Sequence, residues 1–110
     1  MNIKDILVSD GIPAYISGSF AEEETAPDPI WIYTNMMTDN IYVDDNIIYE
    51  VLHYNVAYYS TATENMREIV KAKQKELVKA GFLCGGIVDI KTKDPELFGI
   101  GFECKQVSLY

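Results

Sequence analysis

Residues 47–59, with the sequence IIYEVLHYNVAYY, decide the fold of this chain. Apolar, β-branched and aromatic residues dominate the segment, as is typical of a long β-strand. Alternation places Ile48, Leu52, Tyr54, Val56 and Tyr58 on one face, and Ile47, Tyr49, Val51, Ala57 and Tyr59 on the other. Because both faces are apolar, we expect helices to cover one of them and a neighbouring subunit to cover the other.

The residues before this strand predict a short helix and two further strands. Residues 1–10 have an amphipathic helical pattern, and residues 14–20 and 30–35 alternate like strands. Residues 21–29, with three consecutive glutamates and two prolines, are typical of a solvated loop. Residues 38–46 are rich in Asp and Asn, so we expect a turn, a short extended piece and a second turn there.

Residues 61–80 predict the one long helix. Thr61 and Glu64 have the spacing of a capping box, and Gly81 stands where a left-handed C-terminal cap is expected. The apolar stripe of this helix comprises Met66, Ile69, Val70, Leu77 and Ala80, and the opposite side carries Lys71, Lys75 and Lys79. Lys73 falls within the apolar stripe, where we expect its stem to lie along the surface and its ammonium to reach water; contact with an acidic neighbouring subunit is the alternative.

The last thirty residues predict a hairpin. Residues 87–91 alternate, residues 94–96 supply turn chemistry, and Phe98, Ile100, Phe102 and Cys104 share a face. Gly99 and Gly101 lie on the opposite face, where a helix or another chain can approach closely. After Cys104 the apolar residues change from even-numbered to odd-numbered positions, which predicts a bulge or bend. The hairpin also brings Cys84 near Cys104. A disulfide between them is conceivable but not implied.

Together these elements predict an α+β fold in a single domain, residues 1–110. Its single antiparallel or mixed sheet would have one long helix and a short N-terminal helix packed on one face. These two helices cannot shield both faces of the sheet.

The chain has 110 residues and a formal net charge of −8, which argues against a broad nucleic-acid-binding surface. The charge is uneven, with −9 in residues 1–60 and +1 in residues 61–110. This asymmetry arises either from which face each segment occupies, or from unlike poles that associate head to tail. The sequence lacks an apolar run long enough to span a bilayer and a basic N-terminal leader, so we expect a soluble protein.

The sequence offers no catalytic or cofactor constellation. His53 is the only histidine, and on a strand face it is expected to be packed, hydrogen-bonded or at an interface. The serines lack a nucleophile elbow, and the paired glycines lack the spacing of a phosphate loop. A calcium loop starting at Asp39 fails, because Ile41, Val43 and Val51 occupy ligand positions. Solvated turns explain these acidic residues better, although a looser cation site between subunits stays open.

The order of the short motifs resembles that of tail-completion proteins of long-tailed bacteriophages, also called tail terminators or tail-to-head joining proteins. Many of them have a turn with two Asp-Asn pairs and a tyrosine before a long strand, followed by a helix, a Gly-Phe or Gly-Ile pair and a C-terminal hairpin. The matching residues here are Asp39, Asn40, Asp45, Asn46, Tyr49, Gly81 and Phe82. Asp44 stands where the family often has a small residue, and the strand ends differently, which limits the transfer of interface roles.

The resemblance implies a structural protein without catalysis, metal or cofactor. Such subunits form a ring, commonly a hexamer, on the end of the tail tube. The implied partners are other copies of the chain, the tail-tube protein and a head-completion or connector protein, with DNA only passing through the lumen. The implied location is the host bacterial cytoplasm during assembly and then the head–tail junction of the virion.

The uneven charge and the apolar strand suggest which residues meet a neighbouring subunit. The candidate interface residues are Lys71, Lys75, Lys79, Tyr49, Glu22, Glu23 and Glu24. The three glutamates and Asp28 form an alternative set, an acidic lumen that repels passing DNA. Competing interpretations of the whole chain are another phage head-completion or interaction module of similar α+β design, and a small enzyme or ligand-binding domain. The Asp/Asn turn favours the ring subunit over the module, and the missing catalytic constellation argues against an enzyme.

Overall fold

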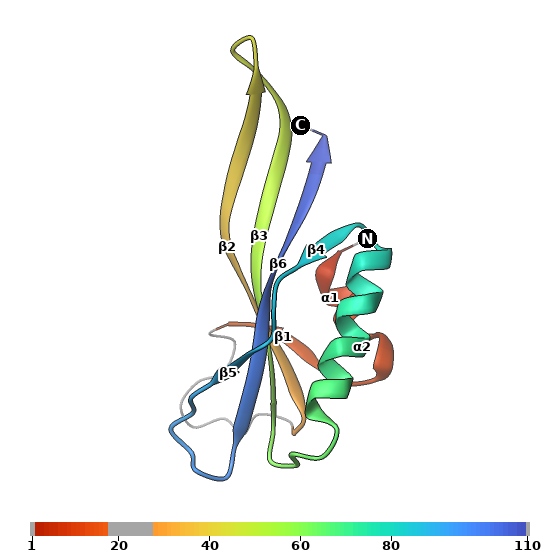
Figure 1. Ribbon diagram of the computed structural model, residues 1–110, viewed down its shortest axis with the longest axis vertical. Coiled ribbons are helices and arrows are strands. Elements are labelled where there is room, and N and C mark those ends of the chain that lie inside the picture. The colour runs from red at the N-terminus through yellow and green to blue at the C-terminus, as the bar shows by residue number, and fades with distance from the viewer. Residues whose placement is uncertain (1, 18–27, 110) are drawn as a thin grey trace.

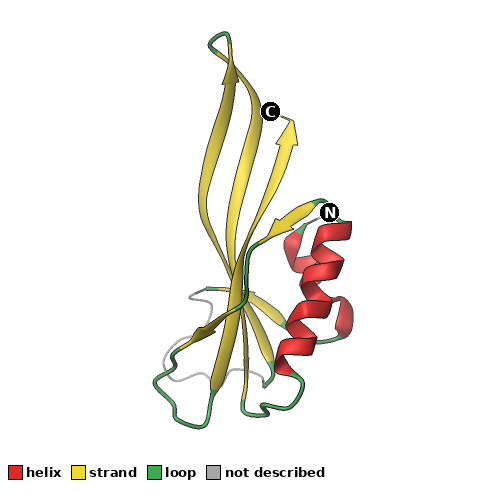
Figure 2. Ribbon diagram, viewed as in Figure 1, coloured by secondary structure: helices red, strands yellow, loops and turns green. Residues whose placement is uncertain are grey.

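The computed structural model describes residues 2–17 and 28–109 and confirms the α+β fold (Figures 1 and 2). The helices are α1 (Ile3–Leu7), continued by a 3-10 turn (Val8–Asp10), and α2 (Met66–Lys79). The strands are β1 (Ala14–Ile16), β2 (Ile30–Val43), β3 (Asn46–Ser60), β4 (Phe82–Cys84), β5 (Val88–Ile90) and β6 (Phe98–Leu109).

The strands form one mixed sheet in the order β1-β2-β3-β6-β4, with β5 also pairing to β6. Among the described strands, β1 runs parallel to its neighbour and the other pairs are antiparallel. Strands β4 and β5 lie one after the other along the same edge of β6, which is the hairpin that the sequence predicts. The helices lie together on one side of the sheet (Figure 2).

The core lies between the helices and one face of the sheet. Val56 and Tyr58 of β3 are buried there with Trp31 of β2 and Phe102 of β6. Because opposite residues in an antiparallel pair share a face, this side of β3 carries its even-numbered residues. The helices contribute Leu7, Val70 and Leu77, which are fully buried. We call this the helix face of the sheet, and the side with the odd-numbered residues of β3 the open face.

The first of the two turns expected in the Asp/Asn-rich segment is wrong, whereas the short extended piece and the second turn are confirmed. Strand β2 continues through Val43, and its residues 38–43 pair with β3 from Leu52 to Asn46. Only Asp44 and Asp45 turn, with φ of 50° and 65°. Asp tolerates this left-handed backbone better than most residues, and such a turn matches the twist of a hairpin. The apolar partners on β3 therefore override the local turn signal.

Helix α2 begins at Met66 rather than at residue 61, and the predicted capping box does not form. Thr61 instead donates hydrogen bonds from its amide and its hydroxyl to the Asp28 carboxylate just before β2. These bonds favour the ionised carboxylate and hold the pKa of Asp28 below its usual value. At the other end of the helix, Gly81 has φ of 97°, which confirms the left-handed position that the sequence predicts.

Lys73 does not reach water, contrary to the expectation from its position near an edge. It is 1% exposed, and its Nζ donates to the Ile6 carbonyl at 2.8 Å and to the Ser9 hydroxyl at 3.0 Å. Two carboxylates also lie near Nζ, with Glu76 Oε2 at 3.3 Å and Asp10 Oδ2 at 3.5 Å. The ammonium thereby ties the end of α1 to the middle of α2, and its acidic partners belong to its own chain.

The bulge predicted after Cys104 is absent, since β3 and β6 keep one register from Tyr49↔Leu109 to Ser60↔Phe98. The apolar residues change face instead: Phe102 and Cys104 lie on the helix face, whereas Val107 and Leu109 lie on the open face. The irregularities fall in the β2–β3 pair, between Asn35 and Met37 and between Ile41 and Tyr42.

Cys84 and Cys104 are register partners on β4 and β6, as predicted, and both are free thiols. Burial, with a smaller contribution from Cys84, raises the pKa of Cys104 from 9.0 to about 12. Its proton is therefore held more tightly in the folded chain than in the unfolded one. This thiol contributes stability that is fully present below the unfolded pKa and is lost as the pH rises toward about 12.

We expect the free energy of unfolding to fall between pH 9 and pH 10, because Cys104 ionises there in the unfolded chain but not in the folded one. Denaturant titrations of the wild type and of Cys104→Val across this window measure the effect. The variant should lose part of the pH dependence, because valine carries no titrating proton. Identical slopes in the two proteins would contradict this assignment.

Candidate functional site

The feature that stands out is a three-stranded ribbon that extends beyond the helices (Figure 1). Strand β3 has 15 residues and is about 50 Å long at 3.3 Å per residue. Helix α2 has 14 residues and is only about 21 Å long at 1.5 Å per residue. The helix therefore cannot cover the length of the sheet, and the molecule measures 52 × 29 × 22 Å along its principal axes. We define the distal ribbon as residues 37–43, 47–53 and 105–109.

The two faces of the distal ribbon differ in polarity. Successive cross-strand rows on the open face are Ile41–Tyr49–Leu109, Asp39–Val51–Val107 and Met37–His53–Lys105. The matching rows on the helix face are Asn40–Glu50–Ser108 and Thr38–Leu52–Gln106. The ribbon is thus mainly apolar on the open face and mainly polar on the helix face, and neither α1 nor α2 extends along most of its length (Figure 1).

The apolar residues of the ribbon are exposed to solvent in this single chain. Leu109 is 76% exposed, and Met37, Ile41, Tyr49 and Val107 are also exposed. Val51, at the centre of the open face, is 9% exposed. We call Met37, Ile41, Tyr49, Val51, Val107 and Leu109 the open-face patch. A contiguous apolar surface of this kind is typical of a protein–protein interface.

One side-chain hydrogen bond crosses the open-face patch. His53 Nε2 lies 2.9 Å from Asp39 Oδ2, and Lys105 follows His53 in the same cross-strand row. His53 is therefore a hydrogen-bonded residue on a strand face, as the sequence predicts. No group of three or more His, Cys, Asp or Glu side chains within residues 2–17 and 28–109 could hold a metal ion.

The structure separates the residues that carry the family resemblance. Asp39 and Asn40 lie within β2 on opposite faces, whereas Asp45 and Asn46 lie at the hairpin turn. Asn46 donates from its side chain to the Asp44 carbonyl at 3.3 Å, a local contact that supports the turn. The four residues therefore shape the hairpin rather than converge on one site. Tyr49 is the only tyrosine of the motif, and it lies in the open-face patch.

The remaining predicted interface residues lie elsewhere. Lys71, Lys75 and Lys79 are exposed on the outer side of α2, away from the core, as the helical wheel predicts. Glu22, Glu23 and Glu24 lie outside the described residues. Asp28, the fourth residue of the predicted acidic lumen, accepts two hydrogen bonds from Thr61 and so has a local structural role.

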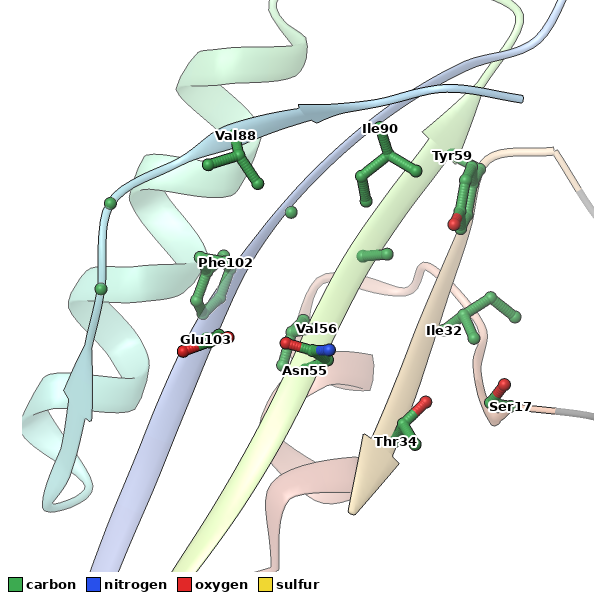
Figure 3. Close-up of a pocket in the computed structure, with 14 residues that line it drawn as sticks. Ser17, Ile32, Thr34, Asn55, Val56, Tyr59, Val88, Ile90, Phe102 and Glu103 are labelled. Carbon is green, nitrogen blue, oxygen red and sulfur yellow. The ribbon is translucent and has the colours of Figure 1, made fainter. Parts of the chain in front are cut away.

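The open face also holds a groove next to the ribbon (Figure 3). Its volume is about 560 Å³, and its floor includes the small residues Ala57 and Gly101. Val88 and Ile90 of β5 lie on one side and Ser17 on the other. The Ile90 and Tyr59 side chains approach Gly101 and Gly99, so strands of this chain already make a close approach at these glycines.

Sequence reasoning missed most of the open-face patch. It placed Tyr49 and Val51 on one of two apolar faces without deciding which of them a neighbour covers. It assigned Ile41 to a short extended piece between turns, and it explained the phase shift to Val107 and Leu109 by a bulge or bend. The alternation of Val107 and Leu109 could have indicated that both lie on one face of a strand. The β3–β6 register is needed to show that this is the face of Tyr49 and Val51.

No protein-family model matches the chain, and no curated protein matches it. Within the described residues, no helix is both long enough and apolar enough to cross a membrane.

Proposed function

We propose that this protein is a structural subunit of a homo-oligomeric ring that caps the tail tube of a long-tailed bacteriophage and joins it to the head connector. The proposal combines the motif resemblance with one structural observation: the distal ribbon projects from the core with its apolar face uncovered. A ring supplies neighbouring copies that cover this face, and it needs no catalytic group.

The polarity of the ribbon supports an interface between proteins. A ribbon with an exposed apolar face and exposed strand edges favours aggregation in water. Covering the open-face patch would remove Leu109, Val107 and Ile41 from water and stabilise the ribbon at the same time. The helix face of the ribbon carries Asn40, Glu50 and Ser108, which suit solvent.

Two neighbouring residues on β6 provide the test. Val107→Glu places a charge in the open-face patch, whereas Ser108→Glu places the same charge on the helix face of the same strand. We expect Val107→Glu to weaken subunit association at least about tenfold, because an unpaired carboxylate would be desolvated in the interface. Ser108→Glu should associate like the wild type.

Association is measured by sedimentation velocity, with and without the tail-tube protein encoded in the same genome as a template. Electron microscopy of polymerising tubes then shows whether the wild type caps tube ends and limits their length. Tubes that grow equally with and without the protein would overturn the tail-tube role. Equal association of the two glutamate variants would overturn the assignment of the interface to the open face.

A further inference from the structure

We infer that the hairpin tip of one copy docks on the outer face of α2 in the next copy. The hairpin tip comprises Tyr42, Val43, Asp44 and Asp45, and we call Lys71, Lys75 and Lys79 the lysine row. The inference rests on the proposed ring and names a second, charged contact within it, separate from the open-face patch.

The hairpin tip combines two acidic side chains with two exposed apolar ones. Tyr42 is 59% exposed and Val43 is 51% exposed, directly before the two turn aspartates. Residues 37–53 contain four acidic residues and no lysine or arginine. In the described part of the chain, neither Asp44 nor Asp45 forms an ion pair. The tip therefore presents two unpaired carboxylates beside a large apolar surface.

The outer face of α2 has the complementary character. Apart from the buried Lys73, helix α2 contains four basic and two acidic residues, and the lysine row repeats every four residues along one exposed side. The row spans about 12 Å at 1.5 Å per residue. Val78 lies on the same side, three residues after Lys75, and is 54% exposed. No ion pair joins the lysine row to another described residue.

Charge and polarity match between these two surfaces. Asp44 and Asp45 can pair with lysines of the row, while Tyr42 and Val43 cover Val78. Individual exposed ion pairs contribute little, but several opposite charges around an apolar centre select the partner and its orientation. The acidic half of the sequence would thus meet the basic helix, which gives the uneven charge a structural role.

The contact must join two molecules. The hairpin tip lies at one end of the long axis of the chain, whereas α2 packs beside the other half of the sheet (Figure 1). Each copy contributes a different surface to the contact, so the arrangement is head to tail. Repetition of a head-to-tail contact closes into a ring when the rotation between copies permits it.

Charge reversal tests this contact with two variants of the full chain. The tip variant carries Asp44→Lys and Asp45→Lys, and the helix variant carries Lys71→Glu, Lys75→Glu and Lys79→Glu. We expect each variant alone to associate at least about tenfold more weakly than the wild type, because like charges then face each other. The control, Lys91→Glu with Lys93→Glu, reverses exposed lysines outside both surfaces and should associate normally.

An equimolar mixture of the two variants is the decisive measurement. A basic tip then faces an acidic helix, and an acidic tip faces a basic helix, so alternating copies should assemble on tail tubes and in sedimentation velocity. A mixture that stays dissociated would overturn the inference and assign the lysine row to another protein. Normal assembly of either variant alone would also overturn it, while the Val107→Glu and Ser108→Glu comparison decides the proposed function independently.

Discussion

Replacing Lys73 with alanine is expected to lower the free energy of unfolding by about 3 kcal/mol, through lost charged hydrogen bonds and a cavity. The ammonium is 1% exposed and donates to the Ile6 carbonyl at 2.8 Å. Alanine removes the charged donor from this carbonyl, which also accepts from the Val8 N–H, and removes the stem that fills the space between α1 and α2. Denaturant titration followed by circular dichroism measures the change.

Two further variants separate the causes of this loss. Lys73→Met keeps a long apolar side chain but not the donor, so it should lose about 1–2 kcal/mol, the cost of the lost hydrogen bonds from a charged donor. Lys75→Ala removes an exposed lysine from the same helix and should stay within about 0.5 kcal/mol of the wild type. A loss at Lys73→Ala no larger than that at Lys75→Ala would show that Nζ is hydrated in solution.

Lys73 also shows where prediction from the sequence stops. The helical pattern placed it correctly within the apolar stripe, because periodicity along one helix is local information. Its partners Ile6, Ser9 and Asp10 lie more than sixty residues earlier, and only the docking of α1 on α2 brings them near. A lysine in an apolar stripe is ambiguous until the element facing it is known.

The same limit explains the errors in the hairpin and in α2. The sequence predicted the strand at residues 47–59 because its pattern is long and regular. It missed the continuation of β2, since Asp39 and Asn40 favour turns locally and only their pairing with β3 makes them extended. The predicted helix starts too early, because the sequence pattern does not show that the Thr61 hydroxyl donates a hydrogen bond to Asp28 instead of capping the helix.

The candidate site was predicted in principle but not in detail. A strand with two apolar faces and only two helices implies an uncovered face, and that reasoning needs no tertiary information. Which residues form the open-face patch depends on the β3–β6 register, which places Val107 beside Val51 and Leu109 beside Tyr49. Strand pairing between distant segments therefore decides the composition of the interface.

Replacing Gly101 with alanine is expected to destabilise the protein by about 2–3 kcal/mol, at the upper end of overpacking effects. A Cβ at this position would lie 2.6 Å from the Val56 carbonyl oxygen and 2.9 Å from Ile90 Cδ1. The carbonyl belongs to the backbone of β3, the central strand of the core, and cannot move without disturbing the sheet. Thermal and denaturant unfolding both measure the loss.

Matched glycine variants show whether the close contact is the cause. Gly86→Ala adds the same methyl group where no atom lies within 4 Å, so it should leave stability nearly unchanged. Gly99→Ala would bring a Cβ within 2.6 Å of Tyr59, but the obstacle is a side chain that can rotate, so we expect an intermediate loss. Equal stabilities of the Gly101→Ala and Gly86→Ala variants would mean that β6 does not approach β3 this closely in solution. Because the same β3–β6 register places Val107 and Leu109 on the open face, that result would also weaken the assignment of the interface.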